Sequence, residues 1–232
     1  MSPFIVLSLI AGVLAIDDRA GWQSLAAQPV FAGLVVGIVT GEVHAALTVG
    51  LLLEFIWLSI LPMRGLRRPD QIAGAIVGCG TAGLVMHFTG DPRLLFIVAA
   101  GTLAGLVAGE LAARLSAPLF AFLNRYLGRV EFSPDARYAG TTRKLIALHA
   151  GSTLYLFVVE AVIVYILLGA GYQAAERLTR YVGGSFVVGA VNWEQLLPAL
   201  GAASLIHIYW HRHLKRVLIL CAVMVILVLW LR

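Results

Sequence analysis

Long apolar blocks follow one another along this chain, and they constrain its fold more than any other feature. A helix that crosses the hydrocarbon core of a bilayer, about 30 Å thick, needs about 20 mostly apolar residues. Hydrophobic residues make up 60% of the chain and charged residues 12%, whereas a soluble domain carries roughly twice that share of charge. The sequence therefore predicts an all-α, polytopic integral membrane protein, with apolar blocks at approximately 3–16, 29–41, 45–61, 71–88, 94–112, 145–170, 185–209 and 214–231.

Basic residues gather between these blocks and give the chain a net charge of +5. Such clusters are typical of cytoplasmic loops in inner-membrane proteins, so the charge is no argument for nucleic-acid binding. The N-terminal residues lack a basic region and a cleavage site, which favours a retained membrane helix over a removed signal peptide. We expect a multi-pass inner-membrane protein whose main basic clusters are Arg64/Arg67/Arg68, Arg125/Arg129/Arg137/Arg143/Lys144, Arg177/Arg180 and Arg212/Lys215/Arg216.

The blocks at 3–16, 29–41 and 45–61 are shorter than a membrane span or are interrupted by charge. Short segments interrupted by Gly or Pro are typical of the broken or re-entrant helices that build transporter binding sites near the membrane midplane. The alternative is one continuous span over 29–49, with Glu42 near its end.

Residues 113–144 differ from the rest of the chain because they are amphipathic at first and then polar. Ser133, Pro134 and Asp135 form a turn signal within them. We expect the main cytoplasmic loop here, beginning as a helix that lies along the membrane surface. The whole chain, 1–232, is interpreted as a single transmembrane domain.

Glycines recur at intervals of four residues within the apolar blocks. Residues at this spacing share a helix face, where glycine lets another backbone come close. The pattern predicts tight helix packing in a compact body at Gly33/Gly37/Gly41, Gly74/Gly78 and Gly101/Gly105/Gly109.

Glu54 lies in the strongly apolar run LLLEFIWL. A carboxylate at the centre of a membrane helix costs about 2.5–3.5 kcal/mol on insertion scales, so it is mostly kept for a cavity, a partner or a proton path. On a helix, Gly50, Glu54 and Trp57 share a face. The carboxylate can accept hydrogen bonds from sugar hydroxyls, and the indole can cover the C–H surface of a sugar. The alternative is a structural ion pair with Arg64, Arg67 or Arg68.

Other polar residues also lie in or near apolar blocks. Glu160, in YLFVVEAVIVYILL, has no polar neighbour on its own helix face, so we expect it to find a partner on another helix or to contact substrate. Asn192, beside Trp193 in GAVNWEQ, is a secondary substrate candidate at an expected loop end. His149 and His207 are interpreted as hydrogen-bonded core histidines.

Motifs of autonomous catalysis are absent from the sequence. There is no Gly-rich phosphate loop ending in Gly-Lys-Ser/Thr, no G-x-S-x-G and no H-E-x-x-H. There is also no His/Cys cluster with metal-ligand spacing, so we expect no metal and no cofactor. Whether the chain takes part in an enzyme reaction stays open, because any chemistry must come from a partner.

Residues 28–70, QPVFAGLVVGIVTGEVHAALTVGLLLEFIWLSILPMRGLRRPD, resemble the IIC membrane subunit of the mannose/fructose/sorbose-type phosphotransferase system. That family typically carries a proline ahead of a GxxxGxxxGD-like run, then a GxxLEhIWLG-like helix with h apolar, then a Pro-Asp pair. Here these are Pro29, the run that ends at Glu42, GLLLEFIWLS and Pro69-Asp70. The C-terminal segment LLPALGAASLIHIYWHRHLKRVLILCAVMVIL is also similar to the family, and the resemblance is weakest in 113–190.

The resemblance implies a IIC fold and a sugar permease that pairs with a IID membrane subunit. Soluble IIA and IIB domains would relay phosphate from phosphoenolpyruvate, and IIB would phosphorylate the sugar as it emerges. The resemblance also implies that Glu54 contacts sugar hydroxyls, with Pro69, Asp70 and Glu42 nearby and Trp57 on the same helix.

The segment SILPMRGLRR departs from the family pattern because it carries three arginines. A guanidinium grips carboxylates well, so Arg64, Arg67 and Arg68 favour either an anionic sugar or contact with anionic lipid. Two other functions remain open. One is an ion-coupled small-solute transporter in which Glu54 and Glu160 titrate, and the other is a regulator or scaffold without flux.

Overall fold

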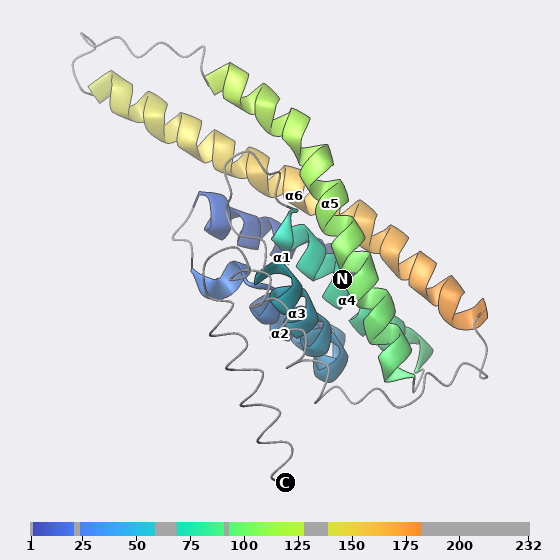
Figure 1. The fold of residues 1–232 in the computed structure, drawn as a ribbon. Coiled ribbons are helices and arrows are strands. Elements are labelled where there is room, and N and C mark those ends of the chain that lie inside the picture. Colours follow the sequence, from blue (N-terminus) through green and yellow to red (C-terminus); the bar gives the residue numbers. More distant parts are fainter. Residues whose placement is uncertain (1, 21–23, 59–68, 91–92, 128–138, 182–232) are drawn as a thin grey trace, which may run out of the picture.

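The computed structural model describes residues 2–20, 24–58, 69–90, 93–127 and 139–181. Within these residues the chain is helical and contains no strand, which confirms the predicted all-α class (Figure 1). The predicted blocks at 185–209 and 214–231, with Asn192 and His207, lie outside the described residues. The elements are α1 (Pro3–Arg19), η1 (Leu25–Ala27), α2 (Pro29–Thr40), α3 (Val43–Leu58), α4 (Gln71–Thr89), α5 (Leu94–Leu127) and α6 (Ala139–Tyr181).

Helices α2 and α3 form a tight hairpin, so the continuous span over 29–49 is wrong. Pro29 occupies the first turn of α2, where its missing N–H costs nothing. Gly41 ends α2 in the left-handed region, with φ of 79°, which favours glycine because it has no Cβ. The two helices then touch backbone to backbone, since a Cβ on Gly37 would lie 2.6 Å from the Cα of Val43.

The hairpin is too short to cross a membrane and return in full helices. Its 12-residue and 16-residue arms are about 18 Å and 24 Å long at 1.5 Å per residue, against a hydrocarbon core of about 30 Å. At its tip, Thr40 packs on Gly83, in the last third of α4. The hairpin therefore runs along most of α4 and has the geometry of a re-entrant element.

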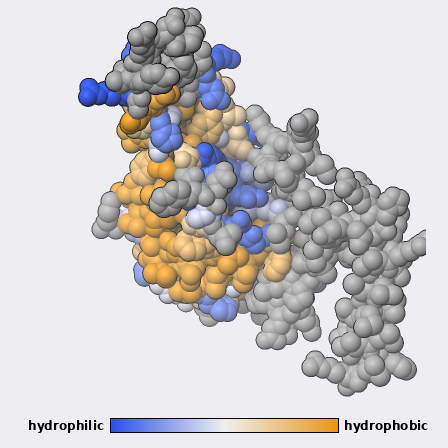
Figure 2. Space-filling model, turned by 90° about the vertical axis from the view of Figure 1, so that its left-hand side faces the viewer, coloured by the Kyte–Doolittle hydropathy of each residue, from blue (hydrophilic) through white to orange (hydrophobic). Residues whose placement is uncertain are grey.

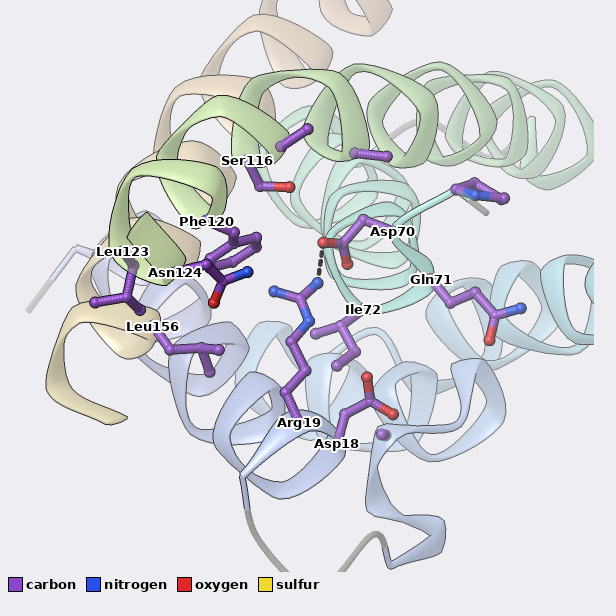
Figure 3. Close-up of a pocket in the computed structure, with 14 residues that line it drawn as sticks. Asp18, Arg19, Asp70, Gln71, Ile72, Ser116, Phe120, Leu123, Asn124 and Leu156 are labelled. Carbon is purple, nitrogen blue, oxygen red and sulfur yellow. Dashed lines mark hydrogen bonds and ion pairs between the residues drawn. The ribbon is translucent and has the colours of Figure 1, made fainter. Parts of the chain in front are cut away.

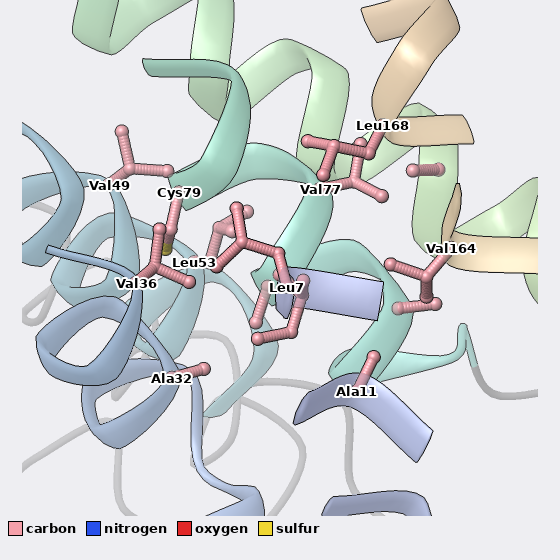
Figure 4. Packing of buried hydrophobic residues seen from close by; sticks show 14 of the residues in the cluster. Leu7, Ala11, Ala32, Val36, Val49, Leu53, Val77, Cys79, Val164 and Leu168 are labelled. Atoms are coloured by element: carbon pink, nitrogen blue, oxygen red, sulfur yellow. The ribbon is translucent and has the colours of Figure 1, made fainter. Parts of the chain in front are cut away.

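Helix α4 is the centre of the bundle. Every residue from Ile72 to Val85 is buried, and α1, α2, α3, α5 and α6 all pack against it. The predicted close packing at glycines is present where α4 crosses α5, because a Cβ on Gly105 would lie 2.8 Å from the carbonyl oxygen of Gly74. Figure 4 shows the apolar core around this helix, with side chains including Leu7, Val36, Leu53, Val77, Cys79, Val164 and Leu168.

Three described helices are long and apolar enough to cross a membrane: Gln71–Thr89, Leu94–Arg125 and Arg143–Tyr181. The 34 residues of α5 and 43 residues of α6 correspond to about 51 Å and 65 Å of helix. Both helices exceed the thickness of the hydrocarbon core, and they extend together beyond the rest of the bundle (Figure 1). The protein is therefore an all-α membrane protein.

The structure differs from the predicted loop at 113–144. Its amphipathic first half is not a separate surface helix but the continuation of α5 to Leu127, with Pro118 inside the helix. Its last residues belong to α6, which begins at Ala139. The hydroxyl of Tyr155 in α6 donates a hydrogen bond to the carbonyl of Leu119 (3.0 Å), so α6 contacts this half of α5.

The outer surface is rich in apolar side chains. Figure 2 shows hydrophobic residues over much of the described surface on the visible face, with hydrophilic residues gathered at one end and in a central patch. The side chains of α5 and α6 that face outward include Leu103, Phe122, Ile146, Leu154 and Ile166, each more than 60% exposed. Such a surface suits a lipid environment. His149 is exposed on α6, so its interpretation as a core histidine is wrong, because no described helix covers that face.

Candidate functional site

Asp70 stands at the start of α4 and caps it. Its Oδ1 accepts a hydrogen bond from the backbone N–H of Ala73 (3.2 Å), and its own N–H donates to the carbonyl of Gly109 in α5 (2.8 Å). A carboxylate is favoured at this position because the N-terminus of a helix presents free N–H groups and the positive end of the macrodipole. The backbone bond to α5 then fixes where the carboxylate projects.

Arg19, the last residue of α1, binds that carboxylate. One guanidinium nitrogen pairs with Oδ2 of Asp70, and the other lies 3.2 Å from Oε2 of Glu160 in α6. The guanidinium carbon also lies 5.1 Å from the ring centroid of Phe120 in α5, within the range of a cation–π contact. Arg19 thus links four helices at one point.

Glu160 is fully buried and finds its partner on another helix, as its sequence context predicts. Its second oxygen, Oε1, has no hydrogen-bond partner within the part of the chain that the structure describes. One cation faces two carboxylates here, since Asp70 and Glu160 share Arg19. Burying a charge without a full set of partners costs free energy. The packing of the surrounding helices must offset that cost.

A cavity of about 570 Å³ opens beside the cluster, between α1, α4, α5 and α6. In Figure 3 the side chain of Arg19 projects from α1 toward Asp70, with Ser116, Phe120 and Asn124 of α5 along one side. The volume lies in the range of small-molecule sites, about 300–1,000 Å³. The lining residues are Asp18, Arg19, Ala27, Pro69, Asp70, Gln71, Ile72, Ala113, Ser116, Ala117, Phe120, Leu123, Asn124 and Leu156.

The lining combines hydrogen-bonding groups of several kinds with an aromatic ring. Carboxylates accept, the guanidinium donates, and the hydroxyl of Ser116 and the amides of Gln71 and Asn124 can do both. Among the described residues, no group of three or more His, Cys, Asp and Glu side chains is arranged to hold a metal ion. The cavity is therefore suited to a small polar solute that carries many hydroxyl groups.

The structure places Pro69 and Asp70 in the cavity lining, while Glu54 lies outside it. The carboxylate of Glu54 faces the start of α2, where the backbone N–H of Val30 donates to its Oε2 (3.4 Å). Ala27, three residues before Val30, lines the cavity. The start of α2 thus connects Glu54 to the rim of the cavity, and the ion pair with Arg64, Arg67 or Arg68 falls on residues outside the described ranges.

Trp57 and Glu42 also lie outside the lining. Trp57 is buried, 5% exposed, and its indole edge fills the space left by Gly74 and Gly109 directly behind Asp70. Glu42 lies in the turn at the hairpin tip, 12 residues before Glu54 and therefore about 18 Å away along the helix. Of the predicted site residues that the structure describes, Glu42 thus lies at the far end of the hairpin from the others.

Several residues of this site carry no strong signal in the sequence. Arg19 follows Asp17 and Asp18 directly after an apolar block, and such a charged triplet at the end of a membrane helix is a usable signal. Ser116, Phe120 and Asn124 recur at four-residue spacing, which places them on one helix face. That pattern becomes informative once 113–127 is known to be part of α5.

The chain is similar to known transport components. A family model described as "PTS system sorbose-specific iic component" matches residues 2–229. A relative from Escherichia coli (strain K12), named "Putative N-acetylgalactosamine permease IIC component 2", is 34% identical over 76 residues, which are 33% of this chain and 56% of the relative. The chain thus matches little more than half the length of that relative. Because the family model spans almost the whole chain, this protein belongs to the family of sorbose-type IIC components of the phosphotransferase system.

Proposed function

We propose that this chain is the sugar-translocating subunit of a mannose/sorbose-type, phosphoenolpyruvate-dependent phosphotransferase system. It would act as a multi-pass protein of the inner membrane, together with a IID subunit and phosphorylated IIB. The observation that carries the proposal is the polar cavity at Asp70, which lies among membrane helices of a chain whose family consists of IIC permease components.

The chemistry of the cavity supports a sugar as the solute. The carboxylate of Asp70 and the amides of Gln71 and Asn124 can bond to hydroxyl groups, and the ring of Phe120 offers an apolar surface for sugar C–H groups. The name of the Escherichia coli relative points to N-acetylgalactosamine as the solute of that protein. An amino sugar is therefore the first substrate to test here, with neutral hexoses beside it.

The α2–α3 hairpin supplies the broken-helix part of the proposed mechanism. Glu54 would contact the sugar or hold the start of α2 at the cavity rim, and Trp57 would support Asp70 from behind. After binding, a shift of the binding unit would carry the sugar across the membrane to phosphorylated IIB. Glu42, Asn192 and the three arginines at 64, 67 and 68 remain candidates for contact during that shift.

The test is sugar phosphorylation by the reconstituted system. The chain is co-expressed with its IID partner, IIA and IIB are supplied, and phosphoenolpyruvate-dependent phosphorylation is measured for wild type and Asp70→Asn. Loss of a charged hydrogen-bond partner predicts a fall in kcat/KM of about 10-fold or more. Glu110→Gln is the control, because Glu110 forms an exposed i, i+4 pair with Arg114 on α5 (2.8 Å). Equal activity of wild type and Asp70→Asn would contradict the assigned site.

A second candidate function is ion-coupled transport of a small solute. The observation that favours it is the buried cluster of Asp70, Arg19 and Glu160, in which one carboxylate oxygen lacks a described partner. Uptake that follows the proton gradient without any IIB phosphoryl donor would support this function over the phosphotransferase. An effect on gene expression without sugar uptake would instead indicate a regulator or scaffold that has lost flux.

A further inference from the structure

We propose that Arg19 is a positioning residue for Asp70 and that Glu160, which lies outside the cavity lining, acts on the site only through Arg19. The inference rests on the proposed function, because it concerns how the sugar cavity keeps its shape. The network that carries it joins the end of α1, the start of α4 and the middle of α6.

The carboxylate of Asp70 is held on both oxygens. Oδ1 accepts from the N–H of Ala73 within the same helix turn, and Oδ2 accepts from the guanidinium of Arg19. Because the two bonds come from different sides, they fix both the position and the plane of the carboxylate. The carboxylate therefore has a fixed orientation at the edge of the cavity, whose lining includes Asp70.

Glu160 holds the other end of the guanidinium. Its side chain is fully buried, whereas that of Arg19 is 26% exposed, and Glu160 is not among the cavity-lining residues. A solute in the cavity therefore meets Arg19 and Asp70 before it meets Glu160. Glu160 thus affects the site by orienting Arg19, which in turn orients Asp70.

The bridge depends on the shape of arginine as well as on its charge. A planar guanidinium can bond to two carboxylates along different directions and lie near an aromatic ring, whereas a lysine ammonium is a compact point charge. The two nitrogens of Arg19 bond to separate helices while its central carbon lies 5.1 Å from the Phe120 ring centroid. Lysine at position 19 can therefore supply the charge but cannot reproduce both bonds and the ring contact.

The three charges allow a charge-matched test. Arg19→Gln alone would leave two buried carboxylates without their cation. The double variant Arg19→Gln/Glu160→Gln removes one positive and one negative charge, so the cluster keeps its net formal charge while Asp70 loses its orienting partner. The exposed pair of Glu110 and Arg114 on α5 offers the same exchange, Glu110→Gln/Arg114→Gln, as a control.

The experiment measures KM and kcat of sugar phosphorylation in the full complex with the IID partner, together with sugar binding to the purified complex in the absence of phosphoenolpyruvate. For the double variant and for Arg19→Lys we expect KM to rise about 10-fold or more, since one charge-assisted bond to Asp70 is lost or misplaced, while kcat per folded complex is unchanged. Glu160→Gln is expected to give a smaller rise, because its carbonyl can still accept from Arg19. The control pair is expected to keep the wild-type KM.

The outcomes separate the two proposals. A wild-type complex that phosphorylates sugar, with variants that keep the wild-type KM but yield less folded protein, would overturn the positioning role and leave Arg19 with a structural one. Unchanged KM in Glu160→Gln alongside a raised KM in Arg19→Lys would overturn the part assigned to Glu160. A wild-type complex that neither phosphorylates nor binds sugar would overturn the proposed function, and the inference with it.

Discussion

Arg19 joins the end of α1 to the start of α4 and to α6 through its two ion pairs. It is the cation for two carboxylates with little exposed surface: the side chains of Asp70 and Glu160 are 3% and 0% exposed. Removing one partner of a buried ion pair leaves an uncompensated charge, which costs far more than the pair itself contributes. Stability and the shape of the cavity are therefore coupled at this residue.

Arg19→Met tests that coupling through stability. We expect the variant to lose about 3–5 kcal/mol of folding free energy, because both carboxylates lose their cation in a buried setting. The measurement is denaturation of the purified protein in detergent. Arg114→Met is the matched control, with an expected loss of about 0–1 kcal/mol because its ion pair is exposed. Similar losses in the two variants would show that the cluster of Arg19 is not a stabilising one.

Among the elements, α4 and α5 depend on the absence of side chains where they cross. Gly74, Gly78, Gly101 and Gly105 bring the two backbones into contact, and glycine is the residue that permits such an approach in membrane helices. The same crossing places the carbonyl of Gly109 where it can receive the N–H of Asp70 (2.8 Å). Helix packing therefore determines the position of the site residue.

Gly105→Ala tests the crossing. The added methyl group would lie 2.8 Å from the carbonyl oxygen of Gly74, and since that atom belongs to a helix backbone the two helices must separate. We expect a loss of about 1–3 kcal/mol, typical of overpacking, measured by denaturation in detergent. At Gly151 of α6 a Cβ would meet no atom within 4 Å. Gly151→Ala should therefore be neutral or should stabilise the protein by up to about 1 kcal/mol. If both variants lost the same free energy of unfolding, the close contact of α4 and α5 would not be the cause of the loss in Gly105→Ala.

At the scale of the whole molecule, we expect the hairpin to determine how the chain is threaded through the membrane. If α2 enters and α3 returns, residues before the hairpin and the start of α4 lie on the same side. Helix α4, with 19 residues and about 28 Å of length, would then carry the chain across. A continuous span over 29–49 would instead require a different threading.

Single cysteines labelled with a membrane-impermeant maleimide test this threading. In a background with Cys79 and Cys221 replaced, Ser24→Cys and Gln71→Cys are expected to react from the same side of the membrane, and Thr89→Cys from the opposite side. Right-side-out and inverted vesicles give the comparison. Reaction of the Ser24 and Gln71 positions from opposite sides would contradict the re-entrant hairpin.

The helices and their close contacts could largely be predicted from local sequence. The apolar blocks match α1 to α4 within about three residues at each end, whereas α5 and α6 extend well beyond their blocks, and the glycine spacing predicted close helix packing, which is present where α4 crosses α5. The extent of α5 could not be predicted, because an amphipathic pattern is the same for a helix on a membrane surface and for one packed against α6. Pro118 lies inside α5, and membrane helices tolerate proline where neighbouring helices support them.

For the site, the sequence was enough to identify residues that are costly to bury and so need a partner, as for Glu160, and the family resemblance pointed to Pro69 and Asp70. The partners themselves follow from the three-dimensional arrangement of the helices. Arg19 and Glu160 are 141 positions apart, and no local pattern relates them. Periodicity and composition specify which face of a helix is buried. An ion pair depends instead on which helices pack together and on their relative position along the helix axes. Helix packing alone brings those charges and the lining of the cavity together.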